Sequence, residues 1–513
     1  MLNLKNNKAT RILSLSFFYI YLDQIVLIDY PYFFKEINIS EEIFTMKKIN
    51  IISLMSLLFA SAIATYADAV KTNDTLAVSV DCAKNIGKIK ALNGVNFGPK
   101  IDQEDILNRC ERDDFRELNV QSVRLHDCPG QCPVLQLVDT NLIFPLMHLD
   151  AKDPRNYIFK DTDDYLKAAT ENGEKIIYRL GITIDHSRAK NRTEMPDAEK
   201  WAEVCCQIIA HYNEGWANGF KMNIEHWEIW NEHELVNRHG RRPMWKGTNE
   251  QFYDFYIKTS KIIKARYPHL KIGGPAFTHA SSKMLPFLKK VSQAKAPLDF
   301  LSYHYYDNSI SKAVMNARIA KKFLVENGFP NAEIHLNEYH YMPVSWKELR
   351  ENPDNYYIFQ EIDSGVWNTA LMTALQDAPM DVCNFYAFGA GLGVQWGTHT
   401  SVFKKKPIYY PFKAFGKLVR FPNRIATSTK GNGVYALAGK NDDGKTALLV
   451  SLFKVKGNEV EIDFKNADTD LSKAKVWLCD IEKNLEEATD VKVDGSKMKV
   501  GFKGEHACVY IEL

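Results

Sequence analysis

The stretch His226-Trp227-Glu228-Ile229-Trp230-Asn231-Glu232 is an apolar, aromatic run that ends in an amide and a carboxyl group. This composition is typical of a buried β-strand whose polar residues begin where the strand stops. A carboxyl group at that point is partly desolvated, which raises its pKa and lets it hold a proton near neutral pH. Residues 333–338 have a similar build, and their Glu338 follows Glu232 by 106 positions. The two strand ends therefore predict a pair of carboxyl groups that act together.

Strand-like and helix-like segments alternate on both sides of this stretch. Such alternation predicts a parallel sheet with crossover helices, and eight strands predict a TIM barrel with insertions. We expect the strands at residues 91–97, 120–126, 175–180, 224–230, 270–274, 298–304, 333–336 and 381–388. We expect the helices at residues 102–118, 163–172, 196–212, 249–267, 284–294, 311–327 and 362–375.

From about Pro422 the chain changes to short runs of alternating apolar residues, separated by turns rich in Gly, Asn and Asp. Regularly spaced short strands of this kind are typical of a β-sandwich. The fold expected for the whole chain is therefore α/β, with a (β/α)8 barrel over residues 70–420 and a β-sandwich over residues 421–513.

A separate pattern starts at Met46, where two lysines precede a mostly apolar run over residues 51–62 and then several alanines. This order is typical of a secretory signal peptide, with cleavage after Ala67 or Ala69. We expect a signal peptide over residues 46–69, a secreted or periplasmic protein, and a mispredicted or disordered extension over residues 1–45. The alternative is a membrane anchor over residues 12–28, but Asp23 and Gln24 interrupt that run and it is short for a span. No stable membrane insertion is expected after cleavage.

The composition describes a globular chain of 513 residues, with 45% hydrophobic, 12% aromatic and 25% charged residues. A net charge of +2 argues against a protein that binds nucleic acid through a broad basic face. The nine cysteines are an odd number, so at least one is unpaired within the chain. Cys128 and Cys132 flank a turn and are candidates for a disulfide, whereas Cys479 and Cys508 lie in strand-like runs and are expected to be buried thiols. No second Cys/His pair with zinc-ligand spacing follows, so we expect no metal and no cofactor.

Residues that end different strands of a TIM barrel converge at one face. Here they are mostly polar or aromatic, which suits a sugar with hydroxyl groups and apolar C–H faces. The residues are Arg124, His126, Asn231, Glu232, His304, Tyr306 and Glu338, with Trp396 in the loop after the eighth strand.

Several of these segments resemble glycoside hydrolase family 39, within the large clan of retaining (β/α)8 hydrolases. The resemblance lies in Trp227 to Glu232, His211-Tyr212, residues 272–276, residues 297–304 and residues 336–339, and it extends over about residues 85–420. It implies a retaining glycosidase that is most similar to β-xylosidases. The long loop between Cys128 and Tyr157 favours a closed pocket, and therefore an exo-glycosidase that removes terminal sugars from oligosaccharides, with an endo-acting enzyme as the alternative. The oligosaccharide is the only partner implied, and the oligomeric state is left open.

The resemblance makes Glu232 the acid/base and Glu338 the nucleophile. It also implies that Asn231 holds the sugar's 2-hydroxyl group and that Arg124 and Tyr306 keep Glu338 ionised. His126, His304 and Trp396 are expected to line the sugar subsites. Glu228 shares the strand parity of Glu232 and is expected to point into the barrel and be paired there.

The sequence departs from the family pattern after Glu232, where His233-Glu234 replaces the usual Pro and Asn or Asp. We expect this position to lie next to the substrate. The loop of residues 238–246 is basic and contains Trp245, which is compatible with an acidic sugar of the α-L-iduronide type. That glycosidase is one alternative function, and a non-catalytic glycan-binding barrel is another.

Overall fold

The computed structural model describes residues 18–21, 24–27, 75–99, 106–126, 128–129, 136–183, 195–389, 396–400 and 404–513. The chain divides into two units, residues 1–73 and residues 74–513. In the first unit, β1 (Phe18–Tyr21) and β2 (Gln24–Leu27) form an antiparallel pair. Both strands fall within the stretch considered above as a membrane anchor. The expected signal peptide lies outside the described residues, and no helix among those described is long and apolar enough to cross a membrane.

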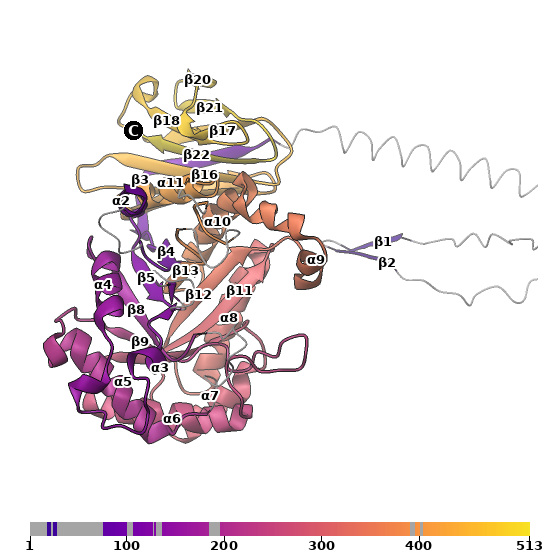
Figure 1. The fold of residues 1–513 in the computed structure, drawn as a ribbon. Helices are drawn as coiled ribbons and strands as arrows, with labels where there is room; N and C mark the ends of the chain where they lie inside the picture. The colour runs from indigo at the N-terminus through magenta and orange to yellow at the C-terminus, as the bar shows by residue number, and fades with distance from the viewer. Residues whose placement is uncertain are drawn as a thin grey trace, which may run out of the picture. The chain divides into compact units, whose positions relative to one another are not determined.

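Eight parallel strands of the second unit close into a barrel, in the order β4-β5-β8-β9-β10-β11-β12-β13 (Figure 1). Each of the eight expected strands is confirmed, and so is the TIM barrel. The strands are β4 (Gly94–Asn96), β5 (Ser122–Leu125), β8 (Lys175–Leu180), β9 (His226–Ile229), β10 (Lys271–Phe277), β11 (Phe300–Asp307), β12 (Glu333–Tyr341) and β13 (Val382–Phe385).

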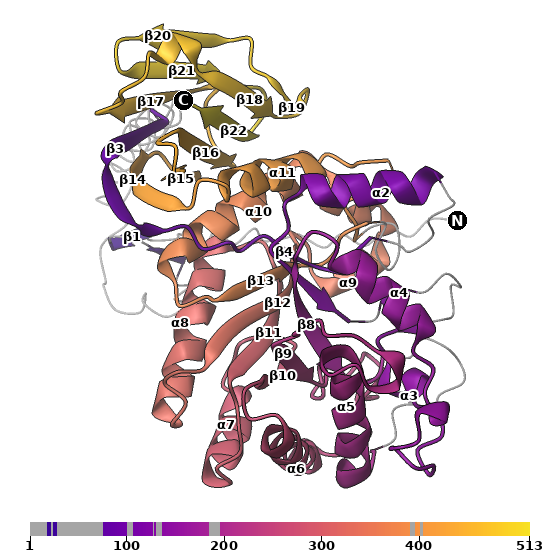
Figure 2. The same cartoon turned by 90° about the vertical axis from the view of Figure 1, so that its left-hand side faces the viewer.

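Helices follow the strands and pack around the barrel (Figure 2). They are α2 (Ile106–Glu117), α4 (Lys160–Ala169), α5 (Ala198–Asn213), α6 (Asn249–Arg266), α7 (Met284–Gln293), α8 (Ile310–Glu326), α10 (Ile362–Ala374) and α11 (Tyr409–Leu418). Their starts follow the chemistry of helix caps: Thr248 and Gln251 form a reciprocal capping box at the start of α6, and Asp197 caps α5. Insertions add α3 (Thr140–Ile143), α9 (Trp346–Glu351) and the short pair β6 (Cys128–Pro129) and β7 (Gln136–Leu137).

The C-terminal strands form the expected second domain, a ten-stranded sheet in the order β19-β18-β22-β16-β15-β14-β3-β17-β21-β20. Both halves of the sheet contribute to one apolar core, for example through Leu448 and Val509 on one side and Val460 and Val500 on the other. The strands after the barrel are β14 (Asn423–Lys430), β15 (Val434–Lys440), β16 (Thr446–Phe453), β17 (Glu459–Lys465), β18 (Lys475–Cys479), β19 (Asn484–Glu487), β20 (Val491–Asp494), β21 (Lys497–Gly501) and β22 (His506–Glu512).

The boundary of the second domain differs from the one expected. Strand β3 (Ala77–Lys88) precedes the barrel in sequence but pairs with β14 and β17 of the C-terminal sheet. Residues 77–88 therefore belong to the sheet and not to the barrel. The cause is non-local pairing, because the register joins Lys88 to Asn423 across most of the chain.

The sheet packs on the barrel through α10 and α11, which lie beside β16 and β22 in both views (Figures 1 and 2). At this contact the Ser451 hydroxyl donates to Thr369 Oγ1 at 2.7 Å, and both side chains are buried. The Lys417 ammonium lies 3.7 Å from the centroid of the Trp477 ring. Cys479 and Cys508 are buried free thiols, as expected, whereas the side chains of Cys128 and Cys132 lie outside the described residues.

Candidate active site

Glu232 lies just beyond β9, at a sharp turn of the backbone. Trp230 and Glu232 both have left-handed backbone conformations, with φ of +73° and +44°. Such a conformation costs on the order of 1–3 kcal/mol in a non-glycine residue and persists where its surroundings hold it. Here the Trp230 amide donates to the Leu180 carbonyl of β8 at 2.8 Å, and the Glu232 amide donates to the Ala276 carbonyl of β10 at 3.0 Å. Both neighbouring strands thus fix the position of the carboxyl group.

Arg124 in β5 is fully buried and bonds four side chains at the centre of the site. Its Nε donates to Glu228 Oε2 and its Nη1 donates to Glu338 Oε1, each at 2.7 Å. Its Nη2 donates to Asn231 Oδ1 at 2.8 Å, and Nη1 also donates to Asn96 Oδ1 at 3.1 Å. Although burial alone lowers the pKa of Arg124, the two carboxylates raise it above its ordinary value. Arg124 is therefore a permanent cation that ties Glu338 to Asn231.

Glu338 is 5% exposed, and both of its carboxyl oxygens are engaged. Besides Arg124, Oε1 lies 3.2 Å from His126 Nε2. On the other oxygen, the Tyr306 hydroxyl donates to Oε2 at 2.9 Å. Burial raises the pKa of Glu338, while His304 and Arg124 act in the opposite direction. The hydrogen bonds orient the carboxyl group, and the charge of Arg124 offsets part of the cost of ionising it in a buried site. A carboxylate nucleophile needs both.

His304 connects the two carboxyl groups. Its Nδ1 lies 2.8 Å from Glu232 Oε1 and 3.4 Å from Glu338 Oε2. The two oxygens can therefore be no further apart than the sum of these distances, 6.2 Å. Burial lowers the pKa of His304, which favours a neutral ring at neutral pH. A neutral imidazole can hydrogen-bond Glu232 in either its protonated or its ionised form. Glu232 can therefore gain and lose a proton without losing this contact.

His126 and Asn231 complete the polar part of the site. The second nitrogen of His126, Nδ1, accepts from Arg179 Nε at 3.2 Å, and burial holds the pKa of His126 well below its usual value. The ring is therefore neutral, with Nε2–H directed at Glu338. Because Arg124 occupies Oδ1 of Asn231, the amide NH2 is the group that Asn231 can offer to a ligand.

Aromatic rings extend from Glu338 towards the surface. The ring of Tyr306 lies 5.7 Å from that of Trp396 and 5.7 Å from that of Trp346, measured between centroids. Trp396 stacks on Phe359 at 4.9 Å, whereas Trp346 in α9 is 45% exposed. Trp396 thus supports Tyr306, and Trp346 provides the exposed aromatic face.

All the residues expected in the site share this one region. Arg124, His126, Asn231, Glu232, His304, Tyr306 and Glu338 are linked by the contacts above, and Trp396 joins them through Tyr306. Glu228 points into the barrel and is paired with Arg124, as expected.

Three residues of the site were not predicted. Asn96 ends β4 and accepts from Arg124, Arg179 donates to His126 Nδ1, and Asn337 Nδ2 donates to Glu228 Oε1 at 2.6 Å. Each is a polar residue inside an apolar strand, and this pattern is the feature of the sequence from which it could have been predicted.

The expectation that His233 lies next to the substrate is wrong. Its side chain is fully buried and its ring stacks on Phe252 of α6, with centroids 3.9 Å apart. Glu234 turns to β10, where its Oε1 accepts from the Thr278 amide at 2.7 Å. The left-handed turn at Glu232 interrupts simple strand alternation, and the following side chain points outward to the helix layer.

The basic loop of residues 238–246 exposes Arg238 and Arg241 to solvent, but its aromatic residue is buried. Trp245 is 1% exposed and packs on Trp230 and Phe255 at 5.4 and 5.2 Å, so its ring is part of the core. The Arg242 guanidinium bonds Asn249 Oδ1 at 2.7 Å. The aromatic residue of this loop is therefore not a sugar platform.

A TIM barrel with two close carboxyl groups at the carboxyl ends of its strands has the architecture of a glycoside hydrolase. Residues 104–387 match the family described as "Glycosyl hydrolases family 39". The chain belongs to that family.

The relatives and structural neighbours are distant. A β-xylosidase from Geobacillus stearothermophilus is 26% identical over 179 residues, which cover 30% of this chain and 34% of the relative. The chain thus aligns with about a third of that relative's length. A glucosidase from Croceicoccus marinus has a similar fold, with a TM-score of 0.69 and 20% identity over 86% of this chain and 99% of that one. A GH39 β-xylosidase from Caulobacter crescentus gives a TM-score of 0.62 and 14% identity over 85% of this chain and 99% of that one.

Proposed function

We propose that the protein is a retaining exo-glycosidase that removes terminal sugars from oligosaccharides, with β-xylosides as its preferred substrates. The observation that carries this proposal is that Glu232 and Glu338 both contact His304. This shared contact limits the distance between the nearest oxygens of the two carboxyl groups to at most 6.2 Å. Retaining enzymes have carboxyl groups about 5–5.5 Å apart, and inverting enzymes about 6.5–9.5 Å. The family and its β-xylosidase relative support the choice of sugar.

In the proposed reaction Glu338 attacks the anomeric carbon while Glu232 gives its proton to the departing glycosidic oxygen. The glycosidic bond breaks, and a covalent ester joins the sugar to Glu338. Glu232 then removes a proton from water, whose oxygen attacks the same carbon and releases Glu338. Asn231 donates to the sugar's 2-hydroxyl group, and Tyr306 and Arg124 stabilise Glu338 whenever it carries charge.

The test is hydrolysis of aryl β-xyloside, α-arabinoside, β-glucoside, β-galactoside and α-iduronide by the mature chain. We expect cleavage of the β-xyloside, and its loss in Glu338→Ala. In Glu232→Ala with azide we expect a glycosyl azide of unchanged anomeric configuration. Glu326→Ala, which removes an exposed carboxyl group of α8, is the matched control and should behave like the parent protein.

Other outcomes distinguish the alternatives. Preferred cleavage of the iduronide would indicate an acidic-sugar glycosidase, for which the exposed arginines of residues 238–241 are the available positive charge. Binding of xylo-oligosaccharides without any hydrolysis would indicate a glycan-binding barrel. Product of inverted configuration would exclude the retaining mechanism.

Export from the cytoplasm is part of the proposal, because residues 46–69 have the order of a signal peptide. The N-terminal residue of the protein recovered from the culture medium or periplasm tests it. We expect that residue to be Asp68 or Val70.

A further inference from the structure

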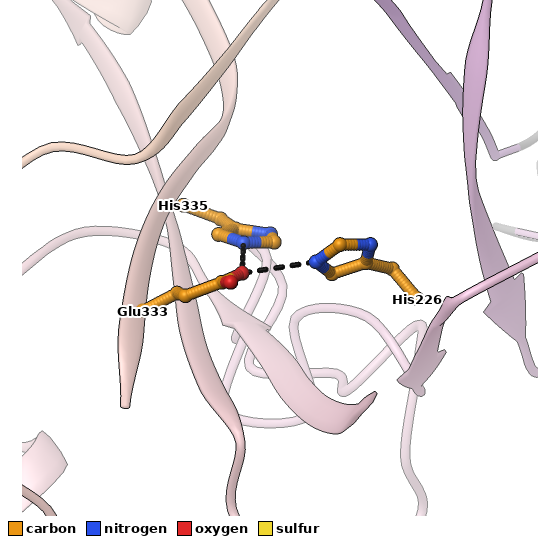
Figure 3. Close-up of side chains that lie close together, drawn as sticks. All are labelled: His226, Glu333 and His335. Carbon is orange, nitrogen blue, oxygen red and sulfur yellow. Dashed lines mark hydrogen bonds and ion pairs between the residues drawn. The ribbon is translucent and has the colours of Figure 1, made fainter. Parts of the chain in front are cut away.

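His226, Glu333 and His335 converge at the end of the barrel opposite the carboxyl pair. His226 is the first residue of β9, and Glu333 and His335 are the first and third residues of β12. Both imidazoles place Nε2 at 2.9 Å from the same oxygen, Oε2 of Glu333 (Figure 3). Among the described residues, these three form a group of metal-ligating side chains whose ligand atoms lie within 4.8 Å of one another.

We propose that these three side chains form a binding site for a divalent transition ion, with zinc as the probe. Two imidazoles and one carboxylate are the donor set of many zinc sites, in which a water takes the fourth position. Zinc bonds of about 2.0–2.2 Å place neighbouring ligand atoms roughly 3.3 Å apart in a tetrahedron. The nitrogen–oxygen distances of 2.9 Å are slightly shorter, so small side-chain rotations admit an ion.

The surroundings hold the two imidazoles by packing and charge, because Nδ1 of His335 is buried without a hydrogen-bond partner among the described residues. The His335 ring is fully buried and stacks on Phe300, with centroids 4.4 Å apart and planes 11° from parallel. On the far side of His226, Nδ1 lies 3.8 Å from a carboxyl oxygen of Glu225. The Glu333 side chain is 24% exposed, which leaves a route for the ion and its water.

Lys271 is the feature that argues against an ion, and it makes the proposal testable. Its ammonium lies 2.5 Å from Glu333 Oε1 and 3.0 Å from Glu225 Oε1. The lysine thus occupies one oxygen of Glu333 and leaves Oε2 to the histidines. Its charge is outweighed by those of Glu225 and Glu333, so the cluster carries a net charge of −1 when the imidazoles are neutral. Removing the lysine charge should strengthen binding of a cation but weaken a cluster that is only hydrogen-bonded.

The site would join β9 to β12 at the floor of the barrel, across the two strands between them. It is separate from Glu232 and Glu338, so the ion has a structural role and does not take part in the proposed hydrolysis. An ion that binds only the folded state raises its stability in proportion to the logarithm of ion concentration.

The experiment uses the full chain after treatment with a chelator, titrated with Zn2+ alone by calorimetry. We expect one ion per chain, a rise in Tm, and intense visible absorption when Co2+ replaces Zn2+. His226→Gln and Glu333→Gln should each weaken binding at least tenfold, and His335→Gln should do so if it folds. His239→Gln, which removes an exposed histidine outside the cluster, is the matched control and should bind as the parent protein does.

Lys271→Gln distinguishes a metal site from a cluster that is held only by hydrogen bonds and ion pairs. We expect it to bind Zn2+ on the order of tenfold more tightly than the parent protein while its metal-free Tm falls. Mg2+ and Ca2+ should not compete, because those ions prefer oxygen ligands. Unchanged Zn2+ affinity in His226→Gln and Glu333→Gln, or no stoichiometric binding in the parent protein, would overturn the proposal.

Discussion

The guanidinium of Arg124 lies 2.7 Å from the Glu338 carboxylate, and the same side chain reaches Asn231 at 2.8 Å. Its Nε is held by Glu228 at 2.7 Å, so the plane of the guanidinium has little freedom. A planar fork of donors can serve three acceptors at fixed angles, which a lysine ammonium cannot do. Arg124 thus sets the relative positions of the proposed nucleophile and the amide that is expected to bind the 2-hydroxyl group.

Arg124→Lys should therefore lower kcat/KM by roughly 10²–10³-fold although the positive charge remains. The loss should lie mainly in kcat, because the nucleophile is misplaced. Steady-state kinetics with the best aryl glycoside measures it, and circular dichroism checks the fold. Arg116→Lys, at a half-exposed arginine of α2, should leave kcat and kcat/KM unchanged. Activity within twofold of the parent protein in Arg124→Lys would contradict this role.

Tyr306→Phe removes the hydroxyl group that donates to Glu338 Oε2 at 2.9 Å. That bond stabilises the charged carboxylate, so its loss should raise the pKa of Glu338 further. We expect kcat to fall about 10–100-fold and the acidic limb of the kcat/KM profile to move to higher pH. A pH series of kcat/KM measures both effects. Tyr357→Phe, at a tyrosine that is 65% exposed, is the control. If the acidic limb stays in place, the hydroxyl does not act on the carboxylate.

Glu338→Gln should make the folded protein more stable at neutral pH. Burial raises the pKa of Glu338 in the folded state above its usual 4.5, so the folded state binds the proton more tightly than the unfolded state does. Stability from this group is then complete below pH 4.5 and is lost as pH rises through the folded pKa. A neutral amide avoids that loss, so the Tm of the variant should exceed that of the parent protein by a few degrees at pH 7. The difference should shrink as pH approaches 4.

Thermal unfolding from pH 4 to 7 measures this difference. Glu326→Gln, at an exposed position of α8, should follow the parent protein throughout. A Tm difference that does not change with pH would show that the ionisation of Glu338 is not its source.

The barrel and most of the site were predictable from the sequence because both depend on local patterns. Each barrel strand is a short apolar run, and the residue at its carboxyl end is directed to a common face whatever the rest of the chain does. Glu232, Glu338, Arg124 and Tyr306 could be assigned in this way, and the structure brings them together.

What could not be predicted depends on distant contacts. Strand β3 has an ordinary alternating pattern, and only its pairing with β14 and β17 places it in the C-terminal sheet. His226 and His335 are more than a hundred residues apart, and their meeting at Glu333 depends on the order of the strands around the barrel. The outward turn of His233 depends on a backbone conformation at Glu232 that no residue pattern signals.

Trp346→Ala should weaken binding of longer substrates. The ring is 45% exposed and lies 5.7 Å from that of Tyr306, so it offers a face on which a second sugar can stack. Stacking of this kind depends on ring area and not on the carboxyl groups. We expect KM for xylotriose to rise about tenfold, with kcat little changed and aryl xyloside kinetics unaffected. Trp346→Phe should restore most of the affinity. Equal effects on the aryl xyloside and on xylotriose would contradict a role of Trp346 in binding a second sugar.

His233→Phe tests whether the residue that packs on Phe252 of the helix layer is without effect on the choice of sugar. Neither ring nitrogen of His233 has a hydrogen-bond partner among the described residues, and Nδ1 lies 3.6 Å from Glu234 Oε2. Burying an unpaired polar group costs about 1–3 kcal/mol, and burial holds the pKa of His233 well below its usual value. A phenyl ring can keep the stacking on Phe252 without that cost, so we expect a higher Tm and unchanged kcat, KM and sugar preference. His233→Ala, which leaves a cavity, should lower the Tm instead. A changed sugar preference in His233→Phe would return this position to the substrate site.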